Sequence, residues 1–495
     1  MQNSDSEPLN IRLIISGLVL VILLGAIEQT VVAVALPVIA GQLDGFAQMA
    51  WVISAYLVAC TVATPIWGKL SDIHGRSASL SAAILIFTLG SLGCALATTM
   101  PQLIGFRVLQ GLGGGGLISV AQATIANVVP LRERGRYQGY ISGVYAAASL
   151  AGPILGGYLT HYLSWRYIFW INLPLGLLAL WLVRRSLRNL PVTHAQHKVD
   201  YVGAVLFAAG LTAVLIAMSR LGQGVAAAEP LNLLLAIGGA AMLLAFGWHS
   251  HRSSEPLIPL ALFRNKTVTI CCVVLFLAFF QFISMSVLLP LRLQLAGGMA
   301  PDASALRLLP LTLAIPFGAF LAGRLMSASG HYKRLQLGGT IAATVGGVAL
   351  AMTPLNQPVL MVVTLVVMGV GLGFQFPTSM VATQNAVAVG HIGVATALTS
   401  LSRLLGGAVG VALLSSLLTT LLRHALPDAP ADLFGALLGD AAGRGAADGA
   451  FRQLFLISAG MSAIAPLLVW QLSEKELRGK LMPVASSAAT TTSTS

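Results

Sequence analysis

The sequence is built from long apolar runs that recur between residues 12 and 471. Each run is about 20 residues long, which is the length that an α-helix needs to cross the hydrocarbon core of a bilayer. The strands of a membrane β-barrel are shorter and alternate in polarity, a pattern that these runs lack. Only 9% of the residues are charged and the mean hydropathy is +0.85. The sequence therefore predicts an all-α integral membrane protein.

The breaks between the apolar runs predict fourteen transmembrane helices. Their expected ranges are 12–39, 50–68, 79–98, 101–129, 137–161, 166–184, 200–220, 231–249, 268–293, 304–325, 335–353, 358–380, 392–422 and 452–471. The first run contains a glutamate, lacks a small-residue cleavage pattern and is followed by further spans. We therefore interpret it as a transmembrane helix rather than a secretory signal.

The net charge of +12 comes from lysines and arginines that cluster in alternate connections between the runs. This is the positive-inside pattern of membrane proteins rather than a nucleic-acid-binding surface. With an even number of spans, it predicts that both termini lie in the cytoplasm. All four cysteines, Cys60, Cys94, Cys271 and Cys272, fall inside apolar runs. We expect them to be packing residues rather than disulfides or metal ligands.

The two halves of the chain share a weak internal similarity. GKLSDIHGR at 68–76 resembles GRLMSASGHYKR at 323–334, and GLGGGG at 111–116 resembles GVGLG at 369–373. Such repeats are typical of secondary transporters. They predict the following division: a six-helix bundle in residues 1–190, two additional transmembrane helices in 191–255, a second six-helix bundle in 256–475 and a disordered cytoplasmic tail in 476–495.

Several motifs occur in an order and spacing that match a known family. They are GKLSDIHGR (68–76), FRVLQGLGGGG (106–116), GVYAAASLAGPILGG (143–157), WRYIFWINLPLG (165–176) and EPLIPLALFRNK (255–266). On these motifs the chain resembles the major facilitator superfamily, in its branch of fourteen-helix drug:proton antiporters. The resemblance implies the major facilitator fold and export of substrates by alternating access.

Gly68, Asp72, Gly75 and Arg76 occupy the places of the family signature between the second and third helices. Asp72 and Arg76 are four residues apart, so a charge pair between them can hold neighbouring helix ends together. A solvated loop that only satisfies membrane topology is the alternative. We favour a latch that acts in the conformational change.

The expected helix 137–161 carries small residues at spacings that let another helix approach closely. These are Gly143, Gly152, Gly156 and Gly157. Pro153 removes a backbone donor and bends the helix. The resemblance implies that this contact limits leak and shapes the switch between open states, while generic small-residue packing is the alternative.

Glu28 lies inside the first apolar run, whereas the other acidic residues lie in tails, loops or at helix ends. An acid at the centre of a span costs about 2.5–3.5 kcal/mol on insertion scales and marks an ion or proton pathway. The family segment usually has aspartate here, with Thr30 and Pro37 otherwise in register. The longer glutamate keeps the chemistry of the carboxyl group, so we predict a protonation site.

Arg107 and Gln110 belong to the motif on the expected helix 101–129. At 1.5 Å per residue, Arg107 lies roughly 10 Å and Glu28 roughly 15 Å below the outer ends of their helices, so the two side chains can meet. Burial disfavours a carboxylate and a nearby arginine favours it, which suits a group that loads and releases a proton. A permanent tie between two helices is the alternative interpretation.

A substrate cavity lined by aromatic, thioether and amide side chains would suit bulky apolar molecules. The predicted lining residues are Trp51, Tyr56, Gln110, Gln122, Phe279, Phe280, Gln281, Met285, Phe374, Gln375 and Arg403. The alternative is that these residues face lipid or pack inside a bundle, because aromatic and thioether side chains spaced along a helix commonly do so. Arg403 and Arg292, together with Arg107, leave the charge of the substrate open.

Two transport functions fit these features: proton-coupled antiport that exports drugs or other hydrophobic or amphiphilic compounds, and export of lipids, fatty acids or anionic amphiphiles on the same scaffold. An enzyme is disfavoured because the sequence has no nucleophile constellation, histidine-rich metal cluster or phosphate-binding loop. We expect a monomer in the bacterial cytoplasmic (inner) membrane, with a small-molecule substrate, no nucleic-acid partner and no cofactor besides protons as coupling ion. The sequence leaves a periplasmic adaptor open.

Overall fold

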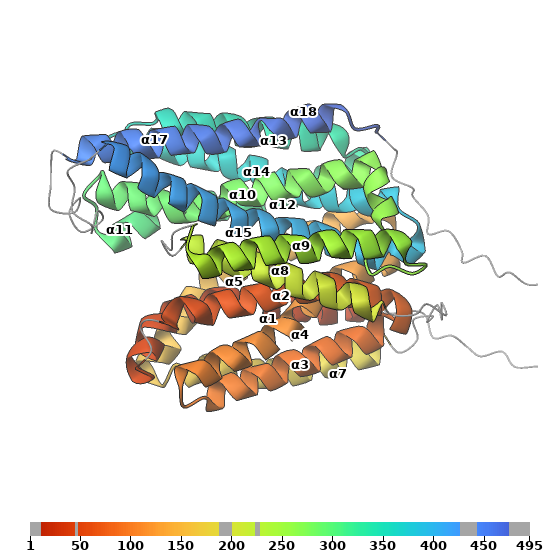
Figure 1. The fold of residues 1–495 in the computed structure, drawn as a ribbon. Helices are drawn as coiled ribbons and strands as arrows, with labels where there is room; N and C mark the ends of the chain where they lie inside the picture. Colours follow the sequence, from red (N-terminus) through yellow and green to blue (C-terminus); the bar gives the residue numbers. More distant parts are fainter. Residues whose placement is uncertain (1–10, 45–47, 188–199, 223–227, 426–442, 475–495) are drawn as a thin grey trace, which may run out of the picture.

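The computed structural model describes residues 11–44, 48–187, 200–222, 228–425 and 443–474 of the chain. Every regular element in these ranges is a helix. The helices form two bundles, with the N-terminal half below and the C-terminal half above in Figure 1. The predicted all-α fold of two helical bundles is confirmed. The predicted tail, 476–495, lies outside the described residues.

Seven helical segments form the N-terminal bundle. They are α1 (Ile11–Gln42), α2 (Met49–His74), α3 (Arg76–Leu96), α4 (Met100–Val128), α5 (Leu131–Tyr162), α6 (Arg166–Trp170) and α7 (Asn172–Ser186). Helix α4 packs between α2 and α3, while α1 packs against α5 and α7. The expected helix 166–184 is interrupted at Ile171, which separates α6 from α7.

The C-terminal bundle repeats this arrangement. Its elements are η2 (Leu260–Arg264), α10 (Lys266–Leu295), α11 (Pro301–Leu306), α12 (Leu309–Ser329), α13 (Lys333–Met352), α14 (Pro358–Ala386), η3 (Val389–His391), α15 (Ile392–Ala425), α17 (Gly443–Ser462) and α18 (Ile464–Trp470). Helix α14 packs between α12 and α13, and α10 packs against α15. The expected helix 304–325 begins instead at Leu309, where a proline in the first turn favours a helix start.

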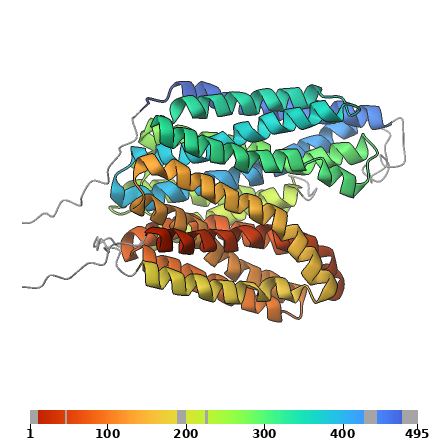
Figure 2. The same ribbon diagram turned by 180° about the vertical axis from the view of Figure 1, so that it is seen from behind.

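Two further helices, α8 (Tyr201–Gly222) and α9 (Pro230–Arg252), lie between the bundles on the face shown in Figure 1. Helix α8 packs against α9, α2 and α15, so this pair covers the seam between α2 and α15. On the opposite face, seen in Figure 2, α5 and α12 pack directly against each other. One seam is therefore covered by the additional helices, and the other is formed by the bundles alone.

The helices have the lengths that a multi-pass membrane protein requires. In the described part of the chain, 13 helical spans are long and apolar enough to cross a membrane. Helix α5 is not among the 13, and it carries charged residues such as Arg134 and Arg136 near its start. It nevertheless extends over 32 residues beside α1 and α12. Each of the fourteen predicted ranges is occupied by helix.

Glycines let the central helix of each bundle approach its neighbours closely. A Cβ atom on Gly113 of α4 would lie 2.3 Å from the backbone of α3, and one on Gly115 would lie 2.5 Å from the backbone of α2. In the C-terminal bundle, a Cβ atom on Gly371 of α14 would lie 2.4 Å from the backbone of α13, and one on Gly373 would lie 2.1 Å from that of α12. The repeated glycine motifs thus serve the same close packing in both halves.

Candidate functional site

A cavity of about 770 Å³ lies between the two bundles, which is a volume typical of small-molecule sites. Residues of α1, α2, α4, α5, α8, α10, α12, α14 and α15 line it. Its wall on α2 runs from Ile53 to Thr64, and its wall on α12 from Thr312 to Ala319. The cavity therefore extends from the middle of the bundles towards the end where α2 and α12 begin.

The opposite end is closed where the Asp72 motif of α2 meets the start of α15. The Asp72 carboxylate lies 2.5 Å from the Arg76 guanidinium and accepts a hydrogen bond from the Val394 backbone N–H at 3.1 Å. Gly68 packs so tightly here that an added Cβ atom would lie 2.7 Å from the Ala397 side chain. The motif thus joins the N-terminal half to the C-terminal half.

Gly75 forms the corner of this motif, between the end of α2 and the start of α3. Its φ of 85° and ψ of 156° belong to a region that residues with a side chain rarely adopt. The sharp corner places Arg76 at the first position of α3, next to Asp72. All four predicted motif residues therefore lie at one junction.

Helices α5 and α12 close the same end on the other seam. A Cβ atom on Gly323 would lie 2.0 Å from the Gly135 carbonyl oxygen, and the Arg136 backbone N–H donates to the Ser327 hydroxyl at 3.1 Å. With both seams closed here, the cavity of this conformation is accessible from the opposite end.

Glu28 forms a buried ion pair with Arg107, and the two side chains are 1% and 2% exposed. The Asn172 amide donates to the second Glu28 oxygen at 2.6 Å. Arg107 also donates to the Val52 carbonyl oxygen at 3.0 Å and to the Gln110 side-chain oxygen at 2.6 Å. Four helices, α1, α2, α4 and α7, therefore meet at this pair.

Ser91 of α3 completes this polar network. Its hydroxyl accepts hydrogen bonds from the Gln110 amide at 2.5 Å and from the Asn172 amide at 3.1 Å. Sequence reasoning missed both Ser91 and Asn172, although a buried amide within an apolar run is a signal of the same kind as Glu28. Hydrogen-bonded networks of this kind hold their members in one arrangement.

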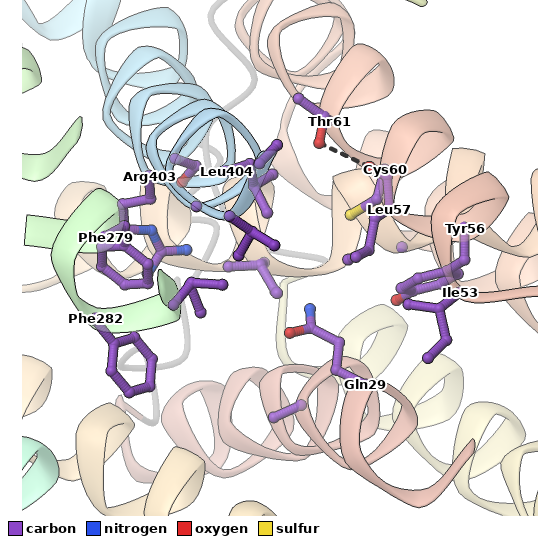
Figure 3. Close-up of a pocket in the computed structure, with 18 of the residues that line it drawn as sticks. Gln29, Ile53, Tyr56, Leu57, Cys60, Thr61, Phe279, Phe282, Arg403 and Leu404 are labelled. Carbon is purple, nitrogen blue, oxygen red and sulfur yellow. Dashed lines mark hydrogen bonds between the residues drawn. The ribbon is translucent and has the colours of Figure 1, made fainter. Parts of the chain in front are cut away.

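The network reaches the cavity through Arg107 and Tyr56. Both line the cavity, and the Arg107 guanidinium lies 4.2 Å from the centroid of the Tyr56 ring. Glu28 itself does not line it, whereas its neighbours Gln29 and Thr30 do. Figure 3 shows Gln29 and Tyr56 at the cavity. The carboxyl group is thus separated from the cavity by one layer of side chains.

The contact between α1 and α5 lies beside this network. A Cβ atom on Gly152 would lie 2.0 Å from the Thr30 hydroxyl, and one on Gly156 would lie 2.7 Å from the Val31 carbonyl oxygen. The Thr30 hydroxyl donates across the contact to a backbone carbonyl of α5 at 3.1 Å. A Cβ atom on Gly143 would meet nothing within 4 Å. Pro153 and Gly157 lie in the same stretch of α5.

The structure places the predicted cavity residues in different environments. Tyr56, Phe279 and Arg403 line the cavity. Phe280 and Met285 pack in the core of the C-terminal bundle instead. Phe279 and Phe282 line the cavity from the same helix, α10, so neighbouring residues of one helix divide between the cavity wall and the core.

The remaining predicted residues lie away from the cavity wall. Gln110 belongs to the Glu28 network, and Gln122, Gln281 and Gln375 are buried within the bundles. Trp51 and Phe374 are half-buried in α2 and α14. Arg292 is buried in an ion pair with Asp448 at 2.9 Å, remote from the cavity lining. Within the described residues, no group of three His, Cys, Asp or Glu side chains is arranged to hold a metal ion.

Comparison with known proteins identifies the family. The family model described as Major Facilitator Superfamily matches residues 18–411 of this chain. An uncharacterized MFS-type transporter of Mycobacterium tuberculosis (strain ATCC 25618 / H37Rv) is 33% identical over 82% of this chain and 59% of its own length. This chain therefore spans about three fifths of that relative. Multidrug resistance protein 3 of Bacillus subtilis (strain 168) is 30% identical over 84% of this chain and 81% of its own length.

Solved structures share the fold at low sequence identity. The proton:xylose symporter XylE has a TM-score of 0.63 at 16% identity, covering 94% of this chain and 97% of that one. The human organic anion transporter MFSD10 (TETRAN) has a TM-score of 0.63 at 14% identity, and the match covers 94% of this chain and 100% of that chain. Since the family match extends over most of the chain and its helices adopt the same fold, the protein belongs to the major facilitator superfamily of membrane transporters.

Proposed function

We propose that this protein is a proton-coupled antiporter that exports drugs or other hydrophobic or amphiphilic compounds, with Glu28 as its protonation site. The observation that carries the proposal is the buried pair of Glu28 and Arg107, whose arginine also forms part of the cavity wall. The Bacillus subtilis relatives named Multidrug resistance protein 3 and Multidrug transporter protein MdtP support drug export as the transport class.

Protonation of Glu28 would change the cavity through Arg107. The neutral carboxyl no longer balances the guanidinium, and an uncompensated buried charge costs about 3–5 kcal/mol when one partner of a buried pair is lost. Arg107 would then favour a conformation in which water or a ligand reaches it. A permanent tie would need no charges, because apolar packing can replace a buried ion pair at no loss of stability.

The proton gradient supplies enough free energy for uphill export. Each charge that moves inward contributes about 2.3 kcal/mol per 100 mV of membrane potential. At about 1.36 kcal/mol for a tenfold ratio, this supports a concentration ratio of roughly fifty. The proposed cycle requires no cofactor.

We place the protein as a monomer in a bacterial cytoplasmic (inner) membrane, with both termini in the cytoplasm. Helix α1 begins and α18 ends at the end of the molecule that carries the Asp72 motif. Lysines and arginines also concentrate in the connections at this end, which supports a cytoplasmic orientation. In this orientation the cavity of the present conformation opens outwards.

Transport in proteoliposomes with an imposed pH gradient tests the proposal. The assay compares the unaltered protein with Glu28→Gln, which keeps the side-chain size but cannot exchange a proton. We expect the variant to lose uphill, gradient-driven transport while it retains exchange of substrate down its own gradient. Glu229→Gln is the matched control, since Glu229 caps the start of α9 away from the cavity. Uphill transport by Glu28→Gln with unchanged dependence on the pH gradient would exclude Glu28 as the coupling site.

A further inference from the structure

The charged side chains of the cavity wall are both basic. Among the described lining residues these are Arg107 and Arg403. Arg107 is neutralised by Glu28. Arg403 has no carboxylate within 4.0 Å in the described ranges of the chain. The cavity therefore presents one positive charge that no carboxylate of the described residues balances.

Arg403 is buried, yet one of its guanidinium donors is not used. The residue is 8% exposed, and its Nε atom has no hydrogen-bond partner among the residues that the structure describes. A guanidinium is a planar fork of N–H donors that matches the geometry of a carboxylate, sulfonate or phosphate. A buried cation with a free Nε donor at a cavity wall is thus suited to receive an anion from the cavity.

The aromatic surroundings of Arg403 stabilise its charge without supplying an acceptor for its Nε donor. Its guanidinium carbon lies 5.1 Å from the ring centroid of Phe279 and 4.6 Å from that of Phe376. Figure 3 shows Arg403 next to Phe279 at the edge of the cavity, with Phe282 nearby. Aromatic faces attract a cation but offer no lone pair in the plane of the guanidinium. An oxygen acceptor has to come from a ligand or from water.

A second polar group that could bind a ligand oxygen lies close to Arg403. The hydroxyl of Tyr145 on α5 is buried and has no well-formed hydrogen bond of 3.5 Å or less within the described part of the structure. Tyr145 lines the same cavity and interacts electrostatically with Arg403. One ligand oxygen can therefore accept from both side chains, which belong to different bundles.

The position of Arg403 orients such a ligand. The lining residues of α15 run from Ser400 to Ala412, and α15 begins at the closed end of the cavity. Arg403 therefore lies near the closed end. The wall between it and the open end includes apolar residues such as Ile283 and Val287. A ligand with an anionic head at Arg403 would place an apolar body along this wall.

We propose that Arg403 and Tyr145 form an anion-binding subsite, and that the exported substrates are amphiphilic or aromatic anions with a carboxylate or sulfonate group. This inference deepens the proposed export function and rests on it. A lipophilic cation would meet an unbalanced positive charge in the cavity, and it is disfavoured as a substrate. The subsite also spans the two bundles, so a bound anion would contact both halves of the transporter.

Two probes with the same ring system test the subsite by equilibrium binding. 1-Anilinonaphthalene-8-sulfonate carries the anionic group, and N-phenyl-1-naphthylamine lacks it. Fluorescence titrations use the full-length protein in lipid nanodiscs at uniform pH, with empty nanodiscs as blank. We expect Arg403→Met to weaken binding of the sulfonate about tenfold or more, as for loss of a charge-assisted hydrogen bond. Binding of the neutral probe should stay unchanged, and Arg403→Lys should restore part of the sulfonate affinity.

Arg324→Met is the matched control, because Arg324 also lies over a phenylalanine ring, at 4.6 Å, but is exposed and outside the cavity lining. It should leave the affinity for both probes unchanged. Melting temperatures of all variants show whether each is folded. Unchanged sulfonate binding in Arg403→Met would overturn the subsite, and so would an equal loss for both probes. Since no pH gradient is applied, this result is independent of whether Glu28 couples protons to transport.

Discussion

The Asp72 carboxylate of α2 accepts a hydrogen bond at 3.1 Å from the backbone N–H of Val394, which lies 322 positions later in the chain at the start of α15. The same carboxylate pairs with Arg76 at 2.5 Å. One side chain thus closes a corner within the N-terminal half and joins that half to the C-terminal half. Its contact with Val394 can exist only while this end of the transporter is closed.

Asp72→Asn should weaken the closed end and reduce transport about tenfold, with the protein still folded. A hydrogen bond to a charged group contributes about 1.5–3 kcal/mol, and about 1.4 kcal/mol corresponds to a tenfold change in the ratio of two conformations. The measurement is the initial rate of export in proteoliposomes, together with the melting temperature. Glu133→Gln removes an exposed acid at the same end of the molecule and should transport normally. Full activity of Asp72→Asn would remove this latch from the mechanism.

Gly156→Ala should destabilise the contact between α1 and α5. The added methyl group would lie 2.7 Å from the Val31 carbonyl oxygen, and a backbone atom cannot rotate away. Overpacking of this kind costs about 1–3 kcal/mol. Gly143→Ala in the same helix meets nothing within 4 Å and should be neutral or stabilising, because alanine favours a helix by about 0.5–1 kcal/mol over glycine. Equal melting temperatures for the two variants would contradict the close contact.

Asn172→Leu should lower stability because it leaves the second Glu28 oxygen without its donor at 2.6 Å. An unsatisfied buried acceptor costs about 1–3 kcal/mol. The double variant with Glu28→Gln should lose less than the sum of the two single variants, since both changes affect the same hydrogen bond. Denaturation of the four proteins in detergent gives the coupling energy. Additive effects would show that Asn172 does not position the carboxyl group.

Asp200→Asn should loosen the attachment of the two additional helices. Burial raises the pKa of Asp200, but hydrogen bonds from the Gly203 backbone N–H at 2.8 Å, from His249 at 2.9 Å and from the Leu257 backbone N–H at 3.3 Å more than offset this. The pKa of Asp200 is therefore held below its usual value. The residue connects α8, α9 and the segment that leads to the C-terminal bundle.

The sign of the pH effect follows from this lowered pKa. A carboxyl group whose pKa is lowered by folding stabilises the folded protein. This stabilisation is fully present when the pH is above the pKa of the unfolded state, about 3.9, and is lost as the pH falls through the pKa of the folded state. The unaltered protein should melt about 1 °C above Asp200→Asn at pH 7, as for a loss of about 1 kcal/mol in a chain of 495 residues. The difference should shrink towards pH 3. A constant difference across this range would show that the charge of Asp200 is not what stabilises the contact.

Local signals in the sequence identified the candidate proton site better than the substrate cavity. An acid or an arginine within an apolar run is conspicuous wherever its neighbours lie, and counting residues from the helix ends gave Glu28 and Arg107 similar depths. Phenylalanine and methionine carry no such signal, because they are equally suited to a cavity wall and to a core. Phe279 lines the cavity while Phe280, the next residue, packs inside the bundle. Only the rotation of α10 in the bundle decides between them.

The sequence alone determined that the chain is a membrane protein of many helices, because the length and polarity of each run limit it to one kind of structure in a bilayer. It also determined the repeated halves, since glycines and charged corners recur at matching places. Only the tertiary structure decided which end of the cavity is closed and that Asn172 and Ser91 hold the Glu28 pair. It also left Arg403 without a counter-charge among the residues that the structure describes. Those facts depend on distances between residues far apart in the chain, which residue types and helical periodicity do not specify.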